Sequence, residues 1–225
     1  MDEAVPFRDR TDAGEQLADA LAPLALESPI LLALPRGGVP VAAPIARRLG
    51  APLDVLLVRK IGMPGNPEVA LGAVVDGQPP QWVVNEWLMA HARLPEDWFD
   101  AEMRRQLDEL KRRRQRYCGD RPAPSLAGRD VIVVDDGIAT GATVRAGLKA
   151  LAATGLRKLL LSVPVGPAEV IDELSRAVDE LVCLARPERF VGVGLHYRDF
   201  SQTDDEEVIR LLGQYGAQAT GAGGG

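Results

Sequence analysis

Residues 131–143, VIVVDDGIATGAT, contain a strand, a loop and the start of a helix. Four consecutive apolar residues, 131–134, predict a short strand that is buried on both faces, since only such a strand forms an unbroken apolar run. Two acids end the strand, and residues 144–151 have the composition and spacing of a helix. The first N–H groups of this helix face the loop without backbone partners, so the loop is predicted to bind an anion such as phosphate.

The side chains of this loop suit a phosphorylated sugar. Thr140 and Thr143 offer hydroxyl donors, and Gly141 lets the backbone approach a ligand closely. Asp135 and Asp136 can accept hydrogen bonds from vicinal hydroxyl groups or help to hold a hydrated Mg²⁺ ion. The alternative is a loop that is rich in Gly and Thr by coincidence. All thirteen positions fit a strand, a loop and a helix start that bind an anion, which disfavours this alternative.

These thirteen residues resemble the signature of the type I phosphoribosyltransferases, which is four apolar residues, two acids, a short turn and Thr-Gly-Gly/Ala-Thr. The resemblance implies that the loop holds the 5-phosphate of phosphoribosyl diphosphate (PRPP). It also implies that Asp135 and Asp136 bind the ribose 2- and 3-hydroxyls, and contribute to Mg²⁺ binding indirectly, through water or PRPP. The implied phosphate loop consists of Ala139, Thr140, Gly141, Ala142 and Thr143.

The composition of the 225-residue chain favours a soluble globular protein, with 46% apolar and 26% charged residues. The apolar runs are too short to cross a bilayer and the N-terminus is acidic, so we expect no membrane association and a cytoplasmic location. A net charge of −6 argues against general nucleic-acid affinity. Cys118 and Cys183 are too few for a disulfide framework or a metal-ligand cluster.

A second unit of strand, loop and helix is predicted at residues 30–34 and 39–49, with Arg36, Gly37 and Gly38 between them. Adjacent glycines let backbone amides wrap an anion while the guanidinium neutralises it. A tight turn with a solvent-exposed arginine is the alternative. The resemblance implies that this loop binds the diphosphate of PRPP.

A third strand is predicted at residues 53–58, ending in Arg59 and Lys60. Residues 61–68 hold two Gly and two Pro and predict a mobile loop. Orotate and adenine phosphoribosyltransferases similarly carry basic residues on a flexible loop that closes over the diphosphate. By that resemblance Arg59 and Lys60 are candidate diphosphate ligands, with two solvated cations as the alternative. The candidate catalytic residues are Arg36, Lys60, Asp135 and Asp136.

Helix and strand patterns continue along the rest of the chain. The predicted helices are residues 11–24, 95–117, 168–176 and 203–212, of which the first and last begin with capping-box spacing at Asp12 and Thr203. The predicted strands are 69–75 and 81–85, as an antiparallel pair, then 158–163, followed by a turn at 164–167, and 181–185. The alternation predicts an α/β fold with a doubly wound parallel sheet, whose ligands lie beyond the carboxyl ends of the strands.

We therefore expect one Rossmann-like domain over residues 1–215, with a helical insertion at about 86–118 and a small hood at about 188–213. A disordered tail is expected from residue 216. The resemblance implies that an acceptor base lies under the hood, where Tyr197 and Phe200 are candidates to stack on it. Both aromatic residues could equally be core residues.

The resemblance implies that the chain is an enzyme, a homodimer that transfers a 5-phosphoribosyl group from PRPP to a nitrogenous base and releases pyrophosphate. Hypoxanthine-guanine enzymes carry a third acid where this chain has Ala139, so the motif is closer to that of the adenine and orotate enzymes.

Two alternatives are a PRPP-binding protein without turnover and a PRPP sensor that binds nucleic acid through basic residues 111–116. Nucleic acid is not the expected partner, because no aromatic residues interleave these charges. A closing loop with Arg59 and Lys60 would favour the enzyme, since a sensor has little need of a lid that excludes water.

Overall fold

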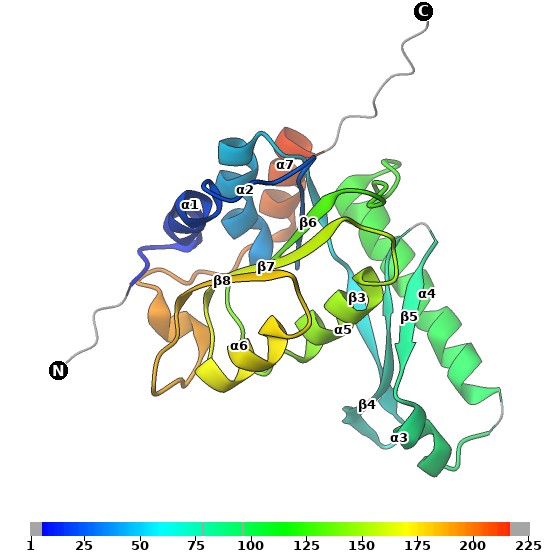
Figure 1. Ribbon diagram of the computed structural model, residues 1–225. Coiled ribbons are helices and arrows are strands. Elements are labelled where there is room, and N and C mark those ends of the chain that lie inside the picture. The colour runs from blue at the N-terminus through cyan, green and yellow to red at the C-terminus, as the bar shows by residue number, and fades with distance from the viewer. Residues whose placement is uncertain (1–5, 78, 96, 217–225) are drawn as a thin grey trace, which may run out of the picture.

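The computed structural model describes residues 6–77, 79–95 and 97–216 of the chain (Figure 1). Its main sheet has five parallel strands in the order β2-β1-β6-β7-β8. The strands are β1 (Ile30–Ala33), β2 (Leu53–Val55), β6 (Asp130–Val134), β7 (Lys158–Val165) and β8 (Glu180–Ala185). The parallel sheet predicted from the alternating pattern is therefore confirmed.

Helices cover both faces of this sheet (Figure 1). One face carries α1 (Arg10–Leu21), α2 (Gly38–Leu49) and α7 (Asp205–Tyr215), and the other carries α5 (Ala142–Leu151) and α6 (Ala168–Ser175). Successive strand residues point to opposite faces, so Leu31 and Ile132 join the first core while Leu32 and Val133 join the second. Burial on both faces explains why β1 and residues 131–134 of β6 have no polar residues between their apolar ones.

A second, three-stranded antiparallel sheet stands beside the main one (Figure 1). It consists of β3 (Val58–Met63), β4 (Asn66–Val75) and β5 (Gln81–Val84), and is followed by α3 (Glu86–His91) and α4 (Trp98–Cys118). The predicted antiparallel pair at 69–75 and 81–85 is confirmed. Helix α3 was not predicted, because six residues are too few for a helical period to show.

The prediction of a mobile loop at residues 61–68 was wrong. Strand β3 continues through Lys60 to Met63 and pairs with β4. Pro64 and Gly65 form the turn between them, and Gly65 adopts a φ of +78°, the positive φ that a type II turn requires at the residue after its proline. The Gly and Pro residues therefore mark a hairpin, which the fully buried Ile61 anchors to the core.

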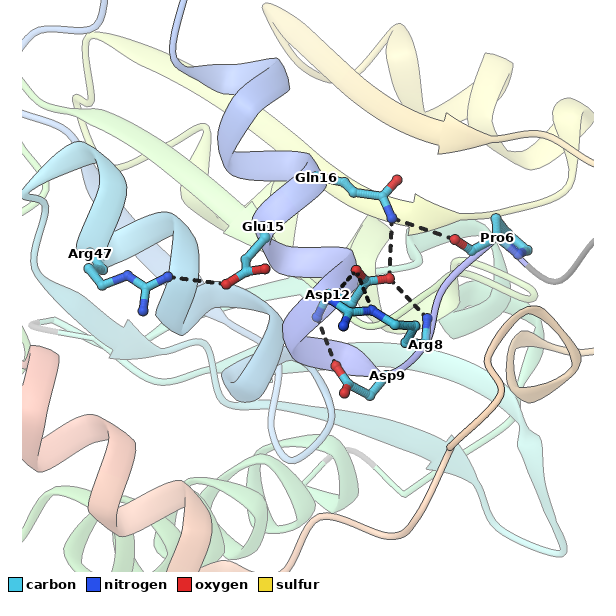
Figure 2. A network of polar contacts seen from close by, with 7 residues as sticks. All are labelled: Pro6, Arg8, Asp9, Asp12, Glu15, Gln16 and Arg47. Carbon is cyan, nitrogen blue, oxygen red and sulfur yellow. Dashed lines mark hydrogen bonds and ion pairs between the residues drawn. The ribbon is translucent and has the colours of Figure 1, made fainter.

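Two helix starts also differ from the predictions. Asp9 caps α1, since its carboxylate accepts a hydrogen bond from the Asp12 N–H at 2.8 Å (Figure 2). Asp204 caps α7 in the same way, accepting from the Glu207 N–H at 2.7 Å. Each helix has a nearby acid or hydroxyl residue that could serve as the cap, and sequence spacing alone selected the wrong one.

Strand β7 extends through Pro164, where a turn was predicted. Its neighbour β6 ends at Val134, opposite Ser162, so at Pro164 only β8 remains alongside. A residue without an N–H is tolerated there because one side of the strand needs no ladder bonds.

The chain segments before α1 and after β8 meet. Phe7 and Tyr197 form an isolated parallel bridge, in which the Arg198 N–H donates to the Phe7 carbonyl oxygen at 3.0 Å. The short 3₁₀ helix Val193–His196 precedes this contact. The tail predicted to be disordered lies, from residue 217 on, outside the described residues. No helix in the described part of the chain is long and apolar enough to cross a membrane.

Candidate active site

Two loops leave the main sheet side by side, at the carboxyl ends of β1 and β6. Ala33 and Val134 are partners in the parallel register, and the Leu34 N–H donates to the Val134 carbonyl oxygen at 2.9 Å. A Cβ atom at Gly38 would lie 2.7 Å from that oxygen, and one at Gly37 would overlap the Asp136 carboxylate. The two glycines are therefore needed for this close approach, and they bring the predicted diphosphate loop against the predicted acid pair.

The loop at residues 139–143 leads directly into α5. Gly141 stands at the N-cap with a φ of +68° and has no side chain to cap the helix; the Ala142 N–H makes a long hydrogen bond of 3.5 Å to Thr140 Oγ1, which a ligand oxygen could replace. Ala139, Thr140 and Thr143 are exposed. The first N–H groups of α5 are therefore open to a ligand, and they carry the partial positive charge of a helix N-terminus. The geometry is compatible with the anion site expected from the sequence, which stays a prediction.

The two acids at the end of β6 have different surroundings. One Asp135 carboxylate oxygen accepts from the Asp136 N–H at 2.9 Å, whereas Asp136 Oδ2 accepts from Arg10 Nε at 2.8 Å. Burial raises the pKa of both carboxyl groups above the ordinary value, and the charge of Asp136 raises the pKa of Asp135 further. Arg10 opposes this effect by lowering the pKa of Asp136. Each acid keeps an oxygen that these bonds do not use.

Arg10 is the functional candidate that the sequence did not reveal. Besides Asp136, its guanidinium donates from Nη1 to the Ser201 carbonyl oxygen at 2.7 Å and lies 3.9 Å from the centroid of the Phe200 ring. The ion pair with Asp136 is largely buried, with 12% of the Arg10 side chain and 15% of the Asp136 side chain exposed. No local motif marks Arg10, because its partners lie 126 residues or more away in sequence.

A polar network holds the segment that carries Arg10 (Figure 2). Asp12 accepts from the Arg8 backbone N–H at 2.9 Å and from the Arg8 guanidinium at 2.8 Å. Glu15 pairs with Arg47 of α2 at 3.3 Å, which ties α1 to its neighbour. These contacts fix the start of α1, and with it the direction from which Arg10 reaches the acid.

Tyr197 lies in the core, while Phe200 stays at the surface. The Tyr197 side chain is 5% exposed, packs between Phe7 and Phe200, and donates its hydroxyl to the Asp136 carbonyl oxygen at 2.6 Å. Burial raises the pKa of this phenol, so the hydroxyl keeps its proton and remains a donor. Phe200 is 37% exposed and carries Arg10 over its ring. Of the two, only Phe200 presents a surface to a ligand.

The three predicted diphosphate cations do not converge on one point. Arg36 turns toward α7, where its Nη1 lies 3.9 Å from Asp205 Oδ1. Arg59 Nε donates to Gln106 Oε1 of α4 at 2.9 Å. Lys60 lies on the other face of β3 and lines a cavity of about 690 Å³. Adjacent strand residues face opposite ways, so Arg59 and Lys60, neighbours in β3, point to opposite faces of the strand.

Comparisons with known proteins agree with this geometry. Residues 11–197 match the family described as phosphoribosyl transferase domain. A crystal structure of TT1426 from Thermus thermophilus is similar, with 45% identity and a TM-score of 0.82 over 94% of this chain and 99% of that one. Two Mycobacterium tuberculosis proteins that are provisionally named phosphoribosyl transferases, MT0597 of strain CDC 1551 and Rv0571c of strain H37Rv, are each 47% identical over 206 residues. The match covers 92% of this chain but 46% of each of those relatives.

Proposed function

Because the chain belongs to the phosphoribosyltransferase family, we propose that it transfers the 5-phosphoribosyl group of PRPP to a nitrogenous base and releases pyrophosphate. The observation that carries this proposal is the meeting of three groups at one edge of the main sheet. They are the glycine loop at 36–38, the acid pair at 135–136 and the open helix start at 139–143. Together they provide one place for a diphosphate, one for ribose hydroxyls and one for a phosphate.

The geometry suits a reaction in which positioning provides most of the catalysis. The bond between the ribose C1 and the diphosphate oxygen breaks, so positive charge develops on the ribose and negative charge on the leaving group. Backbone N–H groups at the start of α5 hold the 5-phosphate, and Asp135 and Asp136 orient the ribose through its hydroxyls. The negative charge of the acids also lies close to the developing cation, while N–H groups of the glycine loop stabilise the leaving diphosphate.

Mg²⁺ would fit this site if water and substrate oxygen atoms supplied the rest of its ligands. Within the described residues, no group of three or more His, Cys, Asp or Glu side chains could hold a metal ion directly. Asp135 and Asp136 offer the hard oxygen atoms that Mg²⁺ prefers, and each has one oxygen outside the bonds described above. When bound, the ion would neutralise charge on the diphosphate.

The acceptor base remains defined only by class. Ala139 supplies no carboxylate to a purine ring nitrogen, which favours an acceptor of the adenine or orotate kind. Phe200 is 37% exposed and contacts Arg10, the partner of Asp136, so of the two predicted aromatic residues it is the one that could contact a base.

A pyrophosphate-release assay with PRPP, Mg²⁺ and a panel of purine and pyrimidine bases tests the proposal. We expect release with at least one base, and its loss in the double variant Asp135→Asn/Asp136→Asn, which should keep the fold and lose PRPP affinity in calorimetry. Asp108→Asn, an exposed acid of α4, is the control and should behave as the wild type. Absence of release with every base would overturn the proposal.

A further inference from the structure

A cavity of about 430 Å³ lies at the opposite end of α5 from the loop at 139–143. Its wall is formed by the last turn of α5, by the segment at 123–127 before β6, and by the end of β4 with the turn that follows. A ten-residue helix is about 15 Å long, which separates the cavity from the open helix start. None of the described residues that line it belongs to the loops at 36–38, 135–136 or 139–143.

This cavity has the size and the lining of a small-molecule site. Such sites commonly have volumes of about 300–1,000 Å³ and are apolar with a few polar groups. The residues that form much of the apolar wall also belong to the second core, and they are Leu32, Leu56, Val75 and Leu151. The polar side chains that interrupt it are Asp76, Gln81, Arg114, Ser125 and Thr154. The lining therefore suits an apolar molecule that carries one polar group.

Two of these polar side chains use their donors within the protein and so present acceptors to a ligand. Gln81 Nε2 donates to the Pro79 carbonyl oxygen at 3.2 Å, which leaves the amide oxygen for another partner. Thr154 Oγ1 donates to the Leu151 carbonyl oxygen at 2.7 Å and can still accept a hydrogen bond. A ligand that satisfies these groups must therefore carry N–H or O–H donors.

Asp76 makes the polar part of the cavity negative. Its Oδ2 accepts from Arg114 Nη1 at 2.7 Å, and Oδ1 lies outside that bond. Arg114 is already engaged, because its Nη2 donates to the buried Asp54 at 2.7 Å and its Nε is itself buried. Two carboxylates share one guanidinium, so the cluster carries one net negative charge, which favours a cationic ligand.

We infer that this cavity binds an apolar amine. The hydrocarbon or aromatic body of the amine lies against the apolar wall, and its ammonium group donates to Asp76. Gln81, the register partner of Val75 next to Asp76, supplies a further acceptor close by. Such binding does not depend on phosphoribosyl transfer, because the described lining is separate from the loops that form the candidate active site.

Two probes with the same body and opposite charges test the inference. Phenethylamine carries an ammonium group on a phenylethyl body, and phenylpropionate carries a carboxylate on the same body. In titrations of the full chain followed by amide NMR shifts, phenethylamine should bind with a Kd of about 1 mM or below and shift the signals of Gly77, Gln81 and Thr154. Phenylpropionate should bind at least about tenfold more weakly. Equal affinities, or shifts confined to residues outside the cavity, would overturn the inference.

Two neighbouring alanines separate binding in the cavity from binding elsewhere on the surface. Ala153 is exposed and lines the cavity, so Ala153→Trp should place an indole ring at its mouth and weaken phenethylamine binding at least about tenfold. Ala152 is exposed and is not among the described residues that line the cavity, so Ala152→Trp is the control and should bind as the wild type does. Unchanged affinity in Ala153→Trp would place the amine elsewhere and overturn the inference.

The variant Asp76→Asn tests the charge. It keeps a side chain of the same size and leaves Arg114 paired with Asp54, and it should weaken phenethylamine binding about tenfold, which is about 1.4 kcal/mol. Phenylpropionate binding should not weaken. Equal effects on both probes in a folded protein would contradict the role of Asp76. Ala153→Trp leaves these ion pairs intact, so it decides the location of the site even where Asp76→Asn unfolds the chain.

A titration of phenethylamine in the presence of saturating PRPP distinguishes the cavity from the candidate active site. We expect the affinity for the amine to stay unchanged, because the two sites lie at opposite ends of α5. Competition between the two ligands would place the amine at the edge of the main sheet and overturn the inference. Amine binding with the expected variant pattern, but without turnover for any base, would refute the proposed reaction and leave the amine site standing.

Discussion

Among the residues that contact the acid pair, Arg10 is expected to contribute most to the free energy of unfolding. Arg10→Ala removes an ion pair at 2.8 Å, a hydrogen bond to Ser201 at 2.7 Å and the contact over Phe200. Loss of a hydrogen bond to a charged group costs about 1.5–3 kcal/mol, and a cation–π contact adds about 0.5–1 kcal/mol. Because the ion pair is largely buried, we expect a loss of about 3 kcal/mol in the free energy of unfolding. For a chain of this size the melting temperature should fall by about 6–12 °C.

The pH dependence of this loss follows from the pKa of Asp136. Burial raises that pKa and Arg10 lowers it, so removal of Arg10 lets the pKa rise further. An ionised Asp136 without its partner penalises the folded state; this penalty grows as the pH rises from the unfolded-state pKa to the raised folded-state pKa and is constant above that. The difference between wild type and Arg10→Ala should therefore be largest at neutral pH and shrink as the pH falls through the raised pKa.

A double-mutant cycle measures the coupling between the two residues. In an Asp136→Asn background the buried carboxylate charge is gone and the Arg10 guanidinium is left unpaired, so Arg10→Ala should cost at most about 1–2 kcal/mol, from the contacts to Ser201 and Phe200. The control is Arg8→Ala two residues earlier, whose side chain is 68% exposed and pairs with Asp12; this variant keeps the backbone N–H bond to Asp12 and should change the free energy of unfolding much less than Arg10→Ala. Thermal unfolding that shows equal losses from Arg10→Ala in both backgrounds would refute this account of Asp136.

Three further predictions concern the same edge of the sheet and its support. Gly37→Ala should lower PRPP affinity at least about tenfold in calorimetry, since its Cβ would displace the Asp136 carboxylate. Retained affinity would contradict this, because it would show that the loop can move to accommodate the Cβ atom. Asp135→Asn should raise the melting temperature at pH 7 by at least about 2 °C, because the raised pKa means that the ionised acid destabilises the fold. That gain should vanish as the pH falls toward about 4. Arg114→Met should lower the melting temperature by at least about 6 °C, since Asp54, 2% exposed, loses its buried partner; a smaller change in thermal unfolding would contradict this.

The sequence predicted those parts of the site that depend on short-range order. Residues 135–143 and 36–38 each follow a strand, and parallel strands end at the same edge of a sheet, so the sequence alone predicts that they converge. The spacing of glycines and threonines predicts an anion site at the start of α5, which stays a prediction; the helix start at Gly141, without an N-cap side chain, is compatible with it.

The parts that were missed depend on contacts between distant segments. Arg10 meets Asp136 only because the segments at 7 and 197 pair, and no local pattern encodes such a bridge. Arg59 and Lys60 were predicted as joint ligands, yet the strand that contains them turns their side chains to opposite faces. The hairpin at 61–68 was mistaken for a loop, because Gly and Pro residues mark both.

The bridge between residues 7 and 197 has a consequence for the order in which the chain can acquire its function during synthesis. Strands β1, β2, β6 and β7 lie within the first 165 residues and can pair before the rest is made. Arg10 is held over the acid by Ser201 and Phe200, which a ribosome adds much later. A nascent chain arrested before that point would carry the sheet and both loops but would lack the anchored counter-charge, so competence to bind substrate should appear last.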